Sequence, residues 1–118
     1  MERIGPAAAS GMFGVSGYFQ RLQSDKNEAL VQRYRDSYGP WAPPLSTLSE
    51  SVYEALHIYA AAVRSARTTE PHAVARHMRS GSFDLPRGNV VMDGPGKPAQ
   101  RLYVAEAMDG ELVPTLAL

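Results

Sequence analysis

The side chains that could do chemistry are few, and their spacing argues against catalysis. The sequence contains three histidines, His57, His72 and His77, and no cysteine. No two of these histidines are four residues apart, which is the spacing that places two metal ligands on one helix face. Serines are frequent, but no Gly-x-Ser-x-Gly sequence is present to form a nucleophile elbow. We therefore expect no catalytic residues, no metal and no cofactor.

Two glutamates come nearest to a catalytic pair. Glu50 and Glu54 are four residues apart, so on a helix they lie one turn apart. Such a pair can act as general acid and base. One glutamate that caps the helix and another in solvent explain the spacing more simply. Five arginines are offset by acidic residues and are expected on exposed helix faces: Arg33, Arg35, Arg76, Arg79 and Arg87.

Aromatic residues form the other chemically useful group. The chain has six tyrosines and three phenylalanines. A tyrosine ring can stack on a small polar ligand while its hydroxyl orients that ligand. Such residues are also ordinary half-buried core residues, and the residue types alone favour that interpretation.

Length and charge restrict the remaining classes. A chain of 118 residues forms at most one domain. Twelve basic residues balance twelve acidic ones, so no field of one sign favours nucleic acid or an anionic membrane. No apolar run is long enough for membrane insertion. The N-terminus lacks the basic start and apolar block of a signal peptide, so the chain as it stands is not expected to be exported.

The periodicity predicts a strand, three helices and then a run of strands. Residues 5–17 are rich in Gly and Ala and are expected to be loop, with a short strand over 15–20. Capping-box spacing predicts helices that open at Asp25 and at Thr47, and Gly39-Pro40 ends the first of them. A shorter helix begins near Thr69, with a proline in its first turn.

The long helix that opens at Thr47 has the strongest pattern. Its apolar residues recur at helical spacing, and alanines widen the apolar surface. The stripe consists of Val52, Leu56, Tyr59, Ala60 and Val63. So few strands cannot cover a helix that is apolar on so many sides. We expect part of its packing surface to lie outside this chain.

Two hairpins are expected after the helices. Residues 83–85 and 90–92 flank a turn over 86–89, and Asp109-Gly110 is a strong two-residue hairpin signal after the strand over 101–108. The returning strand contains Pro114, which favours an edge position.

Four segments taken in order carry a family resemblance. They are GVSGYFQRLQSDKNEALVQRYRDSYG, SESVYEALHIYAAAVRSA, EPHAVARHMRSGSFDLPRGNVVMD and LYVAEAMDGELVPTL. Together they resemble the C-terminal part of the type I periplasmic binding proteins. The most similar branch contains the urea and short-chain-amide receptors of ABC transporters and the amide-sensing regulators of amidase operons.

The resemblance implies an α/β fold: a partial periplasmic-binding-protein-like lobe with one strand, three helices and C-terminal β-hairpins. Residues 1–118 would be a single incomplete domain, the C-terminal segment of a two-lobed protein. The parent would recognise urea, a short-chain amide or an amino acid for uptake. It is not expected to be an enzyme.

The resemblance also implies site residues. Tyr18 and Phe19 match an aromatic pair where a strand approaches the hinge, and Tyr53 matches an aromatic residue near the start of the long helix. We expect these three beside the ligand cleft. The motif Phe-Asp-x-Pro-x-Gly is expected to be structural, through Phe83, Pro86, Gly88 and Val90.

Three interpretations stay open. A transporter receptor would be periplasmic or at the cell surface and would meet an ABC permease. An amide-sensing regulator would be cytoplasmic and would meet a regulatory partner protein. A third alternative is an interaction module that forms a homo-oligomer through the long helix.

Overall fold

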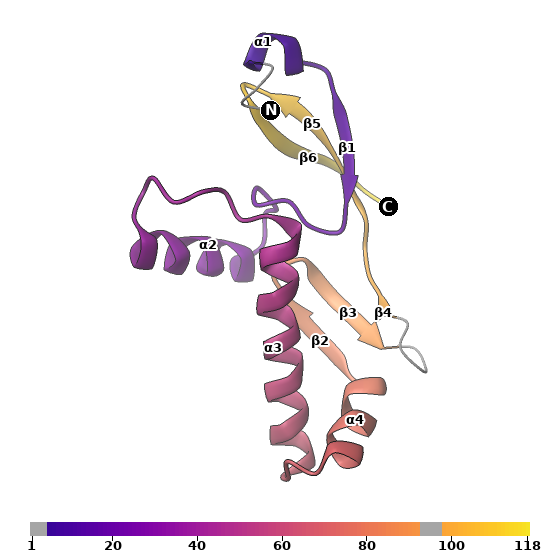
Figure 1. Cartoon of the computed structure of the whole chain (residues 1–118). Coiled ribbons are helices and arrows are strands. Elements are labelled where there is room, and N and C mark those ends of the chain that lie inside the picture. The colour runs from indigo at the N-terminus through magenta and orange to yellow at the C-terminus, as the bar shows by residue number, and fades with distance from the viewer. Residues whose placement is uncertain (1–4, 93–97) are drawn as a thin grey trace.

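The computed structural model describes residues 5–92 and 98–118, and its order of elements is shown in Figure 1. The elements are α1 (Pro6–Ala9), β1 (Phe13–Ser16), α2 (Asp25–Tyr38), α3 (Thr47–Ala66), α4 (Pro71–Arg79), β2 (Ser82–Leu85), β3 (Gly88–Met92), β4 (Pro98–Ala99), β5 (Tyr103–Met108) and β6 (Glu111–Ala117). The predicted α/β class is confirmed. The prediction of loop over residues 5–17 is wrong in part, because α1 and β1 lie there.

The elements form two units. The sheet unit consists of α1 and the antiparallel sheet β1-β5-β6, and the helical unit consists of α2, α3, α4 and the antiparallel sheet β2-β3-β4. Figure 1 shows the sheet unit at the top, joined to the helical unit below by two connecting segments, residues 17–24 and 100–102. The main packing contacts all lie within one unit or the other.

The separation of the units makes the molecule elongated. Its Cα radius of gyration is 16.5 Å, with extents of 52 × 32 × 23 Å. A compact domain of this length has a radius of gyration of about 13–14 Å. The chain therefore buries less surface against itself than a self-contained domain of the same size.

The predicted C-terminal hairpin is confirmed. Asp109 and Gly110 have φ of 50° and 85°, the conformation of a two-residue turn between β5 and β6. Pro114 lies in β6, which is an edge strand of its sheet, as predicted. The earlier hairpin is tighter than expected, because Leu85 pairs with Gly88 and leaves only Pro86 and Arg87 in the turn.

Helices α2 and α3 begin at the predicted residues, Asp25 and Thr47, but the residue that caps each helix lies one position earlier than predicted. Ser24, rather than Asp25, caps α2, because its side chain accepts a hydrogen bond from the Asn27 amide. Ser46 and Ser49 form the capping box of α3. In each helix the serine directly before the predicted capping residue bonds the free backbone amides of the first turn. The capping residue is therefore one position earlier than the capping-box spacing indicated.

The buried face of α3 is not the predicted one. The buried residues of this helix are Glu50, Glu54, Ile58 and Ala62. Ile58 packs with Leu85 and Val90 of the β2–β3 hairpin in a small core. This core is flanked by Met78, Phe83 and Met92.

The predicted apolar stripe of α3 is largely exposed. Val52, Leu56 and Tyr59 are 57%, 65% and 49% exposed. The expectation that part of this helix's packing surface lies outside the chain is therefore consistent with the structure. None of the described helices is long and apolar enough to cross a membrane.

Candidate functional site

A buried ion cluster joins the helix α3 to the β2–β3 turn. Arg87 lies in this turn and forms ion pairs with Glu50 and Glu54, its Nε lying 2.6 Å from Glu54 Oε2. Its Nη2 also donates a hydrogen bond of 2.8 Å to Ser51 Oγ. The side chains of Arg87 and Glu50 are 8% and 0% exposed. Three ionisable groups are thus removed from water and held against one another.

The spacing of the glutamates and the residues of the β2–β3 turn explain why Glu50, Glu54 and Arg87 meet. The spacing of four residues puts both carboxylates on one face of α3. Pro86 fixes its own φ, and Gly88 adopts a φ of 114°, so the two-residue turn presents Arg87 toward that face. The expectation of a capping and a solvated glutamate is wrong, and so is the expectation that Arg87 is exposed. A buried carboxylate pair is stable only beside a cation, and here the cation comes from a hairpin more than thirty residues away.

The electrostatics of the cluster favour one proton on it. Burial, together with the hydrogen bond and negative charge of Glu54, outweighs the lowering effect of Arg87 and raises the pKa of Glu50 to about 8. With both glutamates ionised, the cluster would hold two negative charges against one positive charge. Glu50 Oε1 has no hydrogen-bond partner among the described atoms. A proton on the pair neutralises the surplus charge.

Tyr18 lies fully inside the helical unit. Its side chain is 1% exposed, and its hydroxyl donates a hydrogen bond of 2.9 Å to Asn27 Oδ1. Asn27 in turn donates to the carbonyl oxygens of Gln20 and Leu22. Burial raises the pKa of the Tyr18 phenol. This network fixes the connecting segment 17–24 onto the start of α2.

Phe19 and Tyr53 lie apart from one another. Phe19 is half-buried in the connecting segment, where a Cβ added to Gly14 would lie 3.9 Å from its ring. Tyr53 lies on α3 and lines a pocket between α2 and α3 with a volume of about 660 Å³. The structure therefore places Tyr18 and Phe19 next to each other in the chain and Tyr53 in a separate pocket.

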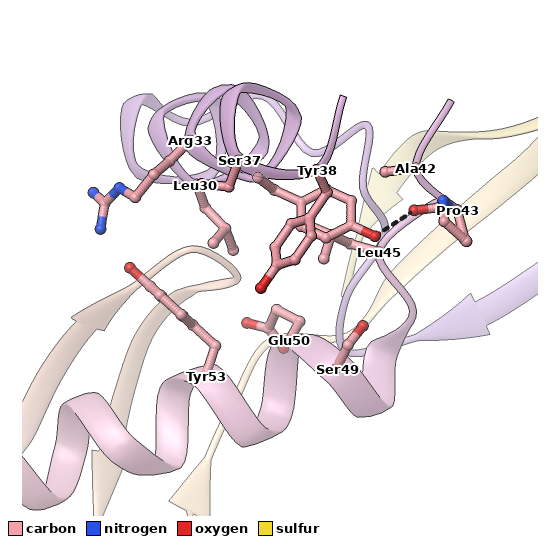
Figure 2. A pocket seen from close by; sticks show the side chains of 11 residues that line it. Leu30, Arg33, Ser37, Tyr38, Ala42, Pro43, Leu45, Ser49, Glu50 and Tyr53 are labelled. Carbon is pink, nitrogen blue, oxygen red and sulfur yellow. Dashed lines mark hydrogen bonds between the residues drawn. The ribbon is translucent and has the colours of Figure 1, made fainter. Parts of the chain in front are cut away.

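The pocket has aromatic and polar walls. Figure 2 shows Glu50 and Tyr53 rising from α3 toward Leu30 and Tyr38 on α2. Arg33 also lines it, and the ring of Tyr38 lies 5.1 Å from that of Tyr34. The volume would suit a small molecule, but the walls also suit packing by an apolar partner.

The histidines do not form a site. His57 Nδ1 donates to the Tyr53 carbonyl oxygen at 2.9 Å, and His77 Nδ1 lies 3.0 Å from Ser65 Oγ. Among residues 5–92 and 98–118, no group of three histidine or acidic side chains is arranged to hold a metal ion.

Comparison with protein families identifies the fold. A model of the family described as periplasmic binding proteins matches residues 1–111. The chain belongs to the periplasmic binding protein family. That family consists of binding proteins rather than enzymes, in agreement with the prediction that the chain is not an enzyme. A comparison with curated proteins found no match.

Solved periplasmic binding proteins share the fold of this chain. A solute-binding protein of an ABC transporter from Rhodopseudomonas palustris, in complex with benzoate, is 22% identical with a TM-score of 0.81, over 93% of this chain and 30% of that one. A leucine-binding protein from Thermotoga maritima is 19% identical with a TM-score of 0.79, over 98% and 33%. A branched-chain amino acid transporter protein from R. palustris is 25% identical with a TM-score of 0.78, over 96% and 33%. The chain spans about a third of the length of these proteins.

Proposed function

We propose that the chain is the C-terminal third of a two-lobed solute-binding protein that serves an ABC transporter in the periplasm or at the cell surface. The family match and the coverage of about a third of each solved relative support this proposal. The sheet unit and the helical unit would belong to different lobes, and the segments 17–24 and 100–102 would be two of the connections that cross between them.

The exposed stripe on α3 carries the proposal. Val52, Leu56 and Tyr59 give this helix a large apolar surface that the described part of the chain leaves in water. Contiguous exposed apolar patches of this kind mark surfaces that a partner covers. The first lobe's sheet, which this chain lacks, is the partner that the proposal assigns to the stripe.

The proposed ligand is a small polar solute such as urea, a short-chain amide or an amino acid. Solved relatives were obtained with benzoate or are described as binding leucine, so the family accommodates different small molecules. We propose that Tyr18, Phe19 and Tyr53 lie beside the cleft of the parent. Phe19 and Tyr53 would contact solute, and Tyr18 would hold the connecting segment through Asn27.

Calorimetry on the parent tests this proposal. The polypeptide translated from the reading frame extended upstream of Met1 would be titrated with urea, acetamide, leucine and benzoate. Binding of urea, acetamide or leucine, weakened at least about tenfold by Tyr53→Ala and unchanged by Arg79→Ala on the exposed end of α4, is the expected result. Heat from benzoate alone, or from none of the four, would contradict the ligand class.

The same stripe favours a second function, self-association through α3. A defined dimer that melts sharply, and that Leu56→Ser converts to a monomer, would favour an interaction module over a part of a binding protein. Size-exclusion chromatography with light scattering distinguishes the two, since an incomplete lobe would give mixed oligomers with a broad melting transition.

A further inference from the structure

The two segments that connect the units converge on one side chain. In the first segment, a Cβ added to Gly17 would lie 3.1 Å from Arg87 Nη1, so the guanidinium sits directly against this backbone. In the second segment, Arg87 Nη1 donates a hydrogen bond of 2.7 Å to Gln100 Oε1. Tyr103, at the start of β5, donates a hydrogen bond of 2.6 Å to the Arg87 carbonyl oxygen. Arg87 therefore contacts both paths by which the sheet unit is attached.

The other end of this arrangement is anchored in α3. Arg87 is paired with Glu50 and Glu54 and donates to Ser51, three side chains on two successive turns of the helix. Removing one partner from a buried ion pair is costly, because it leaves an uncompensated charge out of water. The guanidinium is therefore fixed relative to α3, and the connecting segments that contact it are fixed relative to α3 as well.

Two direct contacts between the units, among the residues that the structure describes, are exposed. Arg21 and Glu111 form an ion pair of 2.6 Å, but their side chains are 56% and 58% exposed. Ser16 and Thr47 share an exposed hydrogen bond of 3.0 Å. Exposed ion pairs contribute little and are screened by salt. They are poor candidates for fixing an angle between two units whose main packing is internal.

We propose that Arg87 is a positioning residue that sets the orientation of the sheet unit relative to α3. Because Arg87 contacts the connecting segments and the two glutamates, the angle between the units can change only if the connecting segments or the buried ion cluster move. This role concerns the geometry of the chain itself and goes beyond the proposed binding function, because it requires no ligand.

Distance measurement between two spin labels tests this role in the 118-residue chain. The absence of native cysteine makes the labelling specific. One label is placed at Arg64→Cys on the exposed side of α3, and the other at Met108→Cys at the exposed end of β5. The labelled chain is diluted with unlabelled chain, so that distances between molecules of an oligomer do not contribute. Double electron–electron resonance should then give one narrow distance distribution within the chain. Arg87→Met should at least double its width while circular dichroism shows unchanged helix content.

If Arg87→Met loses helix content, a second variant that keeps the buried ion cluster intact tests the same role. The double variant Gln100→Ala, Tyr103→Phe removes the links to the second connecting segment and leaves Arg87 with both glutamates. It should broaden or shift the distribution. A width equal to that of the starting chain would overturn the proposal, as would a starting distribution already as broad as that of the variants.

A matched control comes from inside the helical unit. Lys26→Met removes an exposed ion pair of 2.8 Å with Asp84, which joins α2 to β2 without touching either connecting segment. The distribution should stay unchanged. Broadening equal to that of the Gln100→Ala, Tyr103→Phe variant would overturn the assignment to Arg87. Glu111→Gln breaks the exposed ion pair with Arg21. It should change the width of the distribution far less than Arg87→Met or the double variant does.

Discussion

The N-terminal half of α3 reverses the usual distribution of buried apolar and exposed polar side chains. One face carries Glu50 and Glu54, which are 0% and 4% exposed, while the other carries Val52 and Leu56, which are 57% and 65% exposed. An amphipathic surface helix normally has the opposite arrangement. The charged face has its partner, Arg87, within the chain, whereas the apolar face has none among the described residues.

This difference between the faces separates the contacts that the chain makes within itself from those that it leaves unmade. Complete burial of one large aliphatic side chain stabilises a protein by about 1.5–3 kcal/mol. The chain forgoes most of that gain at Val52 and Leu56. A buried ion cluster gives specificity more than stability. The proposed function assigns a covering partner to the stripe, whereas the cluster already holds several segments of this chain together.

The largest expected effect is on the charged face. Arg87→Ala should lower the free energy of unfolding by about 3–5 kcal/mol, because it leaves the glutamate pair and its negative charge buried without a cation. Urea denaturation followed by circular dichroism measures the change. Arg79→Ala, on the exposed end of α4, should change stability by less than about 0.5 kcal/mol. Equal effects of the two variants would contradict the description of the cluster.

A second pair of variants compares the apolar side chains directly. Ile58→Ala removes a side chain that is 8% exposed and should cost about 2–4 kcal/mol of unfolding free energy. Leu56→Ala removes one that is 65% exposed and should cost less than about 0.5 kcal/mol in the 118-residue chain. Thermal melts of the two proteins provide the comparison. A larger loss from Leu56→Ala would mean that the chain covers its own stripe.

The helix boundaries and hairpins could be predicted from the sequence because their signals are local. Gly39-Pro40 ends α2, and Asp109-Gly110 forms its turn, whatever the rest of the chain does. Periodicity chose the wrong face of α3, because the stripe that contains Leu56 is more apolar than the face on which Ile58 follows Glu50 and Glu54. The choice depends on Arg87, which is distant in sequence.

One signal could have revealed the cluster. Two glutamates one turn apart inside an otherwise apolar helix require a cation when they are buried, and Arg87 in a tight turn is a suitable donor. The positions of Tyr18, Phe19 and Tyr53 beside a ligand cleft stay a prediction. Their contacts with solute would form in the longer parent protein that we propose.

The pH dependence of stability sharpens the description of the charged face. The pKa of Glu50 rises from its ordinary 4.5 to about 8, so between these values the folded chain binds more protons than the unfolded one. Stability should therefore fall as pH rises, by at most about 1.4 kcal/mol between pH 6 and pH 7 for one proton. Glu50→Gln should remove this slope in urea titrations. A slope that persists in that variant would assign the proton to another group.

The smallest expected effect concerns the connecting segment. Tyr18→Phe removes the hydroxyl that donates to Asn27 and should cost about 1–1.5 kcal/mol, since a buried acceptor loses its partner. Tyr38→Phe, whose side chain is 72% exposed, serves as the control and should leave the melting temperature unchanged. No difference between the two would argue against a fixed Tyr18–Asn27 contact.

The most direct measurement compares the accessibility of the stripe in two polypeptides. A single cysteine at Leu56→Cys would be labelled with a maleimide in the 118-residue chain and in the protein translated from the reading frame extended upstream of Met1. Arg64→Cys serves as the exposed reference. We predict that labelling at position 56 is at least about tenfold slower in the longer protein, with equal rates at position 64. Equal rates at position 56, or no open frame upstream, would contradict the account.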